Sequence, residues 1–197
     1  LFTNNGNELI TAAEDNAIKY INMETKLVMG ELQNIHLGLW IVTQSLYDLL
    51  KDIVSAVAYI NENTLVSVSE DKSLKFSDAE ERKIIGQLDK LHEDWITCLA
   101  VNELDKLIAT GSSDLSVKII SFVTKETTHF KKLHQSTEFS AIPSVSLLNI
   151  QGPLTAMSFW KARNLLATAA NDRCINIIDV NKQVPIKFEE VHTGKPF

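Results

Sequence analysis

The chain repeats one short unit four times. Each copy carries an aspartate in a polar turn and a Ser or Thr four residues before it. The pairs are Thr11 with Asp15, Ser67 with Asp71, Thr110 with Asp114, and Thr168 with Asp172. An alternating apolar run follows each aspartate, over residues 17–22, 73–78, 116–121 and 174–179. Alternation with a period of two predicts β-strands, and a polar turn between two such runs predicts a hairpin. A hairpin that recurs along the chain restricts the fold to a repeat architecture.

Apolar runs before and after each hairpin predict two further strands, the first and the fourth of the unit. A fourth-strand run follows each hairpin, over 26–29, 83–85, 128–130 and 185–188. A first-strand run precedes three of the hairpins, over 54–59, 96–101 and 154–159, whereas the first copy keeps only Leu1 and Phe2 of this strand. A histidine lies thirteen or fourteen residues after each return strand, at His36, His92, His134 and His192. The repeating unit is therefore predicted to be four short antiparallel strands.

The spacing of the turn aspartates reveals two insertions. The spacings are 56, 43 and 58 residues, so the outer two intervals contain extra sequence, over 37–52 and 135–151. The first insertion has apolar residues at helix-like spacing: Leu39, Val42, Leu46, Leu49 and Leu50. It could bind a partner or pack locally against its own chain. The second insertion is rich in serine and is expected to be a surface loop.

Composition excludes several classes of function. The net charge of −6 disfavours broad electrostatic binding to nucleic acid or to an anionic membrane, because both need a basic face. The two cysteines, Cys98 and Cys174, have no partner at metal-ligand spacing, so no metal or cofactor is expected. No apolar run is long enough for a membrane span. The chain starts at Leu1, so we expect it to be a fragment of a longer protein.

The repeats resemble the WD-repeat family, and the resemblance covers almost the whole chain. Leu107 to Asp114 with Val117 to Ile119 is the best match, and Leu165 to Thr168 with Asn171 and Asp172 is the next. The resemblance implies an all-β fold, a β-propeller of four-stranded antiparallel blades, with about four blades present out of seven or more. The repeats are divergent, because the family's tryptophan at the end of the third strand is replaced by Ile21, Ser77, Ile120 and Ile178.

The resemblance also implies blade boundaries. Residues 1–36 form an incomplete blade, 37–92 a blade with insertion 37–52, 93–134 an ordinary blade, 135–192 a blade with insertion 135–151, and 193–197 the start of the next. Absent sequence or another chain would complete the propeller. In the family's geometry both insertions and all the aspartate turns lie on the same propeller face.

A buried hydrogen-bond network follows from the resemblance. Its members would be His36, Ser67 and Asp71; His92, Thr110 and Asp114; and His134, Thr168 and Asp172. Such sets could be interpreted as hydrolase triads. Because the set occurs in three blades, and one active site is not duplicated in this way, a structural role is favoured. No catalytic residue is expected.

The predicted function is a non-enzymatic scaffold in a eukaryotic intracellular complex, in the cytoplasm or nucleus. Its partners would be protein subunits or peptides bound through the loop-bearing face, with candidate contacts Trp95, Trp40, Glu70, Ser113 and Asn171. Trp95 could instead pack under a loop, and Trp160 is expected at a blade edge or packed between blades. The alternative function is a non-catalytic subunit that binds or processes RNA, although this acidic segment is not expected to contact nucleic acid directly.

Overall fold

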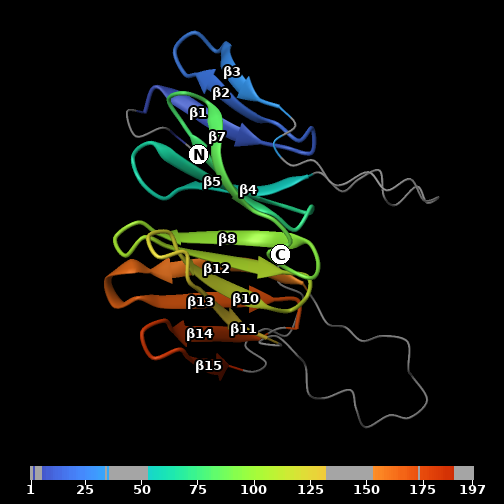
Figure 1. Ribbon diagram of the computed structural model, residues 1–197, viewed down its shortest axis with the longest axis vertical. Helices are drawn as coiled ribbons and strands as arrows, with labels where there is room; N and C mark the ends of the chain where they lie inside the picture. Colours follow the sequence, from blue (N-terminus) through green and yellow to red (C-terminus); the bar gives the residue numbers. More distant parts are fainter. Residues whose placement is uncertain are drawn as a thin grey trace, which may run out of the picture. The chain divides into compact units, whose positions relative to one another are not determined.

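The computed structural model describes residues 2, 6–33, 35, 53–131, 153–172 and 174–188. These residues form antiparallel sheets and one short 3₁₀ turn (Figure 1). The chain divides into two compact units, Leu1–Ile96 and Thr97–Phe197, and each is described by itself.

The first unit contains two sheets. Strands β1 (Glu8–Ala12), β2 (Ile18–Asn22) and β3 (Val28–Leu32) form a three-stranded sheet, to which Phe2 adds an isolated antiparallel bridge with Leu9. Strands β4 (Val54–Tyr59), β5 (Thr64–Ser69), β6 (Leu74–Asp78) and β7 (Lys83–Leu88) form a four-stranded sheet in sequence order.

The second unit contains two four-stranded sheets. One consists of β8 (Ile96–Asn102), β9 (Leu107–Ser112), β10 (Val117–Ser121) and β11 (Thr127–Phe130). The other consists of β12 (Leu154–Trp160), β13 (Leu165–Ala170), β14 (Ile175–Asp179) and β15 (Val184–Phe188), with the 3₁₀ turn η2 (Lys161–Arg163) between its first two strands. The predicted fold class, all-β with four-stranded antiparallel sheets, is confirmed.

One strand begins later than predicted. The sequence pattern placed an outer strand over 26–29, but β3 starts at Val28. The side chain of Asn22 accepts hydrogen bonds from the N–H groups of Glu24 and Thr25, at 2.9 and 2.8 Å, and Lys26 has a φ of 60°. These features extend the turn, because a left-handed residue cannot continue a strand.

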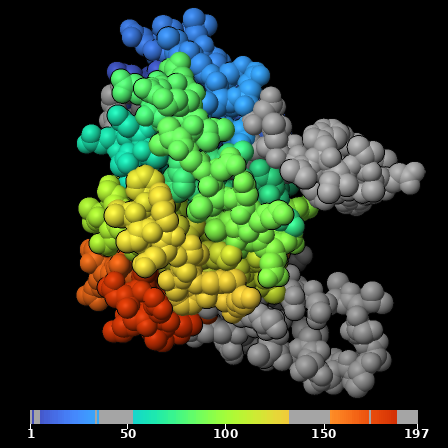
Figure 2. All heavy atoms as spheres, viewed as in Figure 1, coloured from blue at the N-terminus to red at the C-terminus, as the bar shows by residue number. Residues whose placement is uncertain are grey.

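The hydrophobic core of the first unit is formed mainly by strands β1, β2, β4 and β5. In the first unit Ile10, Ile18, Tyr20, Val54 and Leu65 pack together. The outer strands β3 (blue) and β7 (green) lie at the surface of this unit (Figure 2). They expose apolar side chains at Val28, Met29, Ile84 and Ile85.

Arg82 joins the two sheets of the first unit. Its guanidinium donates a hydrogen bond to the carbonyl oxygen of Met29 at 2.7 Å, lies 3.4 Å from a carboxylate oxygen of Glu8, and stacks 4.9 Å from the ring centre of Tyr20. The side chain from the turn before β7 thus fastens the second sheet to the first.

In the second unit the sheets meet at Gly111, on β9. A Cβ atom at this position would lie 2.6 Å from the sulfur of Cys98 and 3.0 Å from Cδ2 of Leu154. Thr97 donates a hydrogen bond from its hydroxyl to the carbonyl oxygen of Leu154 at 2.6 Å. Glycine is required here by close packing, so that β9 can approach β12.

Candidate partner-binding face

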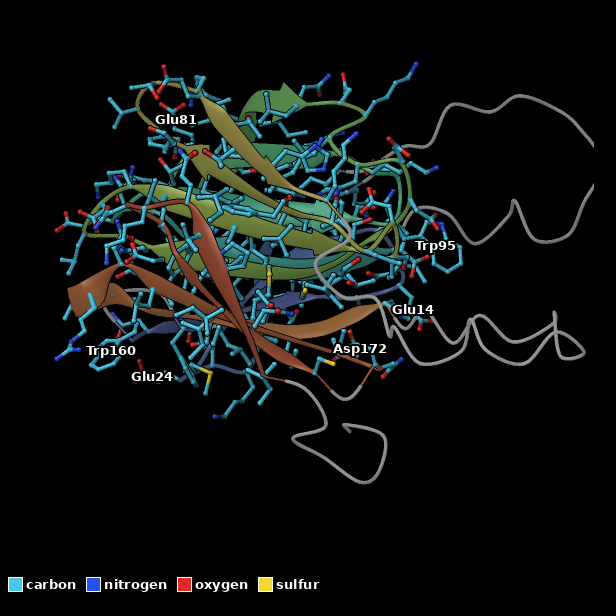
Figure 3. All side chains as sticks on the ribbon, turned by 90° about the horizontal axis from the view of Figure 1, so that it is seen from below. Glu14, Glu24, Glu81, Trp95, Trp160 and Asp172 are labelled. Atoms are coloured by element: carbon cyan, nitrogen blue, oxygen red, sulfur yellow. The ribbon has the colours of Figure 1, made fainter. Side chains whose placement is uncertain are left out.

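In each antiparallel sheet, two of the loops that connect the strands lie at the same end of the sheet. The turn between the second and third strands of a sheet lies at the same end as the connection that enters its first strand. In the first unit, Glu14 and Trp95 lie at one end and Glu24 and Glu81 at the other (Figure 3). In the second unit, Asp172 and Trp160 lie at opposite ends (Figure 3). We call the end with the aspartate turns the aspartate-turn end.

Each turn aspartate caps the strand that follows it. Its carboxylate accepts a hydrogen bond from the N–H two residues later, with distances of 3.3 Å for Asp15, 2.8 Å for Asp71, 2.9 Å for Asp114 and 3.0 Å for Asp172. The next residue has a positive φ in three copies, at Asn16, Lys72 and Leu115. An aspartate side chain that bonds its own backbone two residues on is the Asx turn, so these residues build the turn itself.

Two serines that the sequence reasoning missed complete these turns. The hydroxyls of Ser69 and Ser112 accept hydrogen bonds from the N–H groups of Asp71 and Asp114, both at 3.1 Å. Both serines lie two residues before the aspartate, so the spacing in the sequence could have indicated them. Neither side chain is available to a partner, because both are buried.

Several members of the predicted hydrogen-bond network lie in the described part of the chain, and their side chains are buried. Ser67, Thr110, Thr168 and His92 are all buried. Buried hydroxyl and imidazole groups require hydrogen-bond partners, which agrees with a structural role. His36 and His134 lie outside the described residues. The hydrogen-bond networks of the three His, Ser/Thr, Asp sets stay a prediction, as do the blade boundaries.

Trp95 is exposed on an anchored loop. Trp95 is 39% exposed, and its backbone N–H donates a hydrogen bond to the carboxylate of Asp94 at 2.9 Å. The loop is fixed to the neighbouring turn because the N–H of Leu91 donates to the carbonyl oxygen of Lys72 at 2.8 Å. In return, the Lys72 ammonium donates to the carbonyl oxygen of Glu93, also at 2.8 Å.

The remaining candidate contacts lie in turns at the same end of their own units. Glu70 is half-buried in the first unit, and burial, followed by the nearby charge of Glu14, raises the pKa of its carboxyl. Ser113 and Asn171 are half-buried in turns of the second unit. Trp40 lies outside the described residues. These positions are candidate contacts only.

No group of metal-binding side chains occurs in the part of the chain that the structure describes. In that same part, no helix has the length and apolar character needed to cross a membrane. The buried thiol of Cys98 has its pKa raised to about 11 by desolvation, so it is poorly suited to nucleophilic chemistry.

Comparison with known proteins identifies the repeat. The family model described as "WD domain, G-beta repeat" matches residues 83–121, which include the best-formed hairpin. A "Ribosome biogenesis protein WDR12 homolog" of Caenorhabditis briggsae is 48% identical over 60 residues, which are 30% of this chain and 13% of that protein. "WD repeat-containing protein 55 homolog" proteins of Drosophila simulans and Drosophila melanogaster are each 27% identical over 113 residues, covering 57% of this chain and 20% of the relative.

The matched stretches thus span a fifth or less of the curated relatives' length. WD-repeat proteins are generally interaction scaffolds. The repeat match, the named relatives and the antiparallel sheets agree with one another. Residues 83–121 therefore match a WD repeat, and the four-stranded antiparallel sheets of the described residues are consistent with the blades of a WD-repeat β-propeller.

Proposed function

We propose that the chain belongs to a non-enzymatic scaffold of a eukaryotic multiprotein complex, in the cytoplasm or nucleus. It would bind other protein subunits through the aspartate-turn end of its blades. The observation that carries this proposal is the exposed Trp95 on an anchored loop. A loop whose backbone is already fixed loses less conformational entropy on binding, and tryptophan is enriched among interface residues that contribute most affinity.

The first unit, which carries Trp95, is strongly acidic. It contains 16 acidic and 8 basic residues, a net charge of −8. Glu14 and Glu70 are close enough for the charge of Glu14 to raise the pKa of Glu70. A cationic group on a partner would relieve this repulsion. The partner surface is therefore expected to carry Lys or Arg side chains around an apolar contact.

Substitution of Trp95 tests the site. We expect Trp95→Ala to weaken capture of the protein's partners about tenfold or more, with an unchanged melting temperature. Val123→Ala is the control, since it removes an exposed apolar side chain from a turn of the second unit. Equal partner recovery by wild type and Trp95→Ala would remove Trp95 from the site.

A second candidate function is supported by the similarity to the ribosome biogenesis protein homolog. In this alternative, the chain is a non-catalytic subunit of an RNA-processing complex. Crosslinking in cells followed by RNA sequencing distinguishes the two. Crosslinks to the chain's own residues favour the RNA alternative, and RNA that is recovered only through other subunits supports the scaffold.

A further inference from the structure

A second surface for binding lies on the outer strands β3 and β7 of the first unit. Four apolar side chains of these strands have exposed fractions between 42% and 55%: Val28, Met29, Ile84 and Ile85. We call them the outer-strand surface, and Figure 2 shows both strands on one face of the molecule. The turns beside it carry Glu24 and Glu81, at the end opposite Trp95 (Figure 3). The surface is therefore separate from the aspartate-turn end.

Both strands present these side chains through the same irregularity. The register of β3 against β2 skips Met29, and the register of β7 against β6 skips Ile85. Each is the extra residue of a β-bulge, which bends the strand locally. A bulge in an edge strand also discourages the addition of a further strand. A partner is therefore expected to bind through side chains rather than by extending either sheet.

The exposure of this surface does not depend on where the sequence begins. Strand β3 belongs to the first sheet of the chain, whereas β7 belongs to the second sheet, which packs against the first. The two bulge residues nevertheless have the same exposure, 51% for Met29 and 50% for Ile85. Val28 and Ile84, which also hold matching positions, are 55% and 42% exposed. The outer position of the strands thus accounts for most of the exposure.

The fold does not require apolar side chains at these positions. In the second unit, β11 pairs with β10 without a shift, and Thr127 lies opposite Ile120, at the position that Val28 and Ile84 hold in the first unit. A sheet of the same kind therefore forms with an exposed threonine in this place. Exposed apolar side chains that gather on neighbouring strands are typical of interaction sites.

Arg82 holds the two halves of the surface together. Its guanidinium donates a hydrogen bond to the carbonyl oxygen of Met29 at 2.7 Å, and its side chain lies over Gly30. Because Arg82 directly precedes β7, this contact fixes β3 and β7 relative to each other. A surface that is already fixed loses little conformational entropy when a partner binds.

The turns beside the surface favour a cationic partner. Glu24 and Glu80 hold the same place in the turns before β3 and β7, because the N–H of each donates a hydrogen bond, at 2.9 Å, to the side chain two residues earlier. Neither carboxylate forms an ion pair within the described residues, whereas Arg82 and Lys83 are already paired. Lys26 is the remaining base in these turns. Together with the net charge of −8 on the first unit, this favours cationic partners over RNA or an anionic membrane.

We propose that the outer-strand surface binds a segment of another protein in which Lys or Arg side chains flank apolar ones. The apolar side chains of the segment would cover β3 and β7, and its cationic groups would lie against Glu24 and Glu80. This site does not use Trp95. It would let the scaffold hold a second partner in addition to the one at the aspartate-turn end.

Selection from a random peptide library tests the proposal. Full-length wild-type protein is the bait, and the Ile84→Thr, Ile85→Thr double variant is the parallel bait. Threonine keeps a β-branched side chain on an exposed strand, so the variant is expected to fold. We expect peptides enriched on the wild type alone to combine basic and apolar residues. Their affinity, measured by fluorescence anisotropy, should fall about tenfold or more with the double variant and stay unchanged with Trp95→Ala.

A charge swap keeps the test decisive if the double variant is unstable. Glu80 is exposed and its N–H, rather than its side chain, makes the hydrogen bond of the turn, so Glu80→Lys is expected to fold. It should weaken the selected peptides and bind versions in which glutamate replaces the basic residue more tightly than the wild type does.

Three results would overturn the proposal: no peptide prefers the wild type, the selected peptides lack basic residues, or the swap restores nothing. Dimerisation of the wild type in sedimentation that is lost in the double variant would also overturn it, since the surface would then bind a second copy of this chain.

Discussion

Replacing Gly111 by alanine should destabilise the second unit through one close contact. The added Cβ would lie 2.6 Å from the Cys98 sulfur and 3.0 and 3.2 Å from two atoms of Leu154, where ordinary contacts are 3.4 Å or longer. Cys98 and Leu154 are both core residues, so neither can move aside freely. Overpacking of this kind costs about 1–3 kcal/mol, which corresponds to a fall in melting temperature of about 2–12 °C for a chain of this size.

Gly86→Ala is the matched control, because its added Cβ would lie at an ordinary 3.5 Å from the Phe76 ring. Its melting temperature should stay close to that of the wild type. Removing the sulfur with Cys98→Ala should recover part of the loss, so the two substitutions should couple by about 0.5 kcal/mol or more in a double-mutant cycle. A wild-type melting temperature for Gly111→Ala, or strict additivity with Cys98→Ala, would refute the packing argument.

Three further outcomes are expected. Asp114→Ala removes the acceptor for the N–H of Ser116 and should lower the free energy of unfolding by about 1–3 kcal/mol in urea titration, while Asp114→Asn should lose less. Because burial raises the pKa of Cys98 from 9.0 to about 11, the unfolded thiol ionises first. The free energy of unfolding should therefore fall as pH rises through this window, and an equal slope in Cys98→Ala would contradict that assignment. Arg82→Ala should speed hydrogen exchange in β1 to β3 and leave the second unit unchanged; uniform protection would show that Arg82 does not join the sheets.

Local chemistry made the hairpins predictable from the sequence. An aspartate that bonds the N–H two residues later needs only its own neighbours, and strands such as 54–59 reveal themselves by alternation. The late start of β3 was missed because it depends on Asn22, whose turn-forming role lies outside the apolar pattern.

Contacts between sheets could not be predicted from the alternation of apolar and polar residues. The need for Gly111 depends on how one sheet lies against the next, because Gly111 contacts Leu154, 43 residues later in the chain. The side chains of Asn102, Asn164 and Asn181 form a hydrogen-bonded row across three turns, which also depends on how the sheets lie. Trp40 and both insertions, 37–52 and 135–151, lie outside the described residues, so their predicted roles rest on the sequence.

Affinity capture of the full-length protein, with mass spectrometry after a high-salt wash, tests the scaffold proposal most directly. Salt screens exposed charge pairs but leaves apolar contacts such as that of Trp95 largely intact. The account predicts a defined set of stoichiometric proteins that remains on the wild type and is reduced with Trp95→Ala. Loss of every protein in salt, or recovery of RNA in place of protein partners, would contradict it.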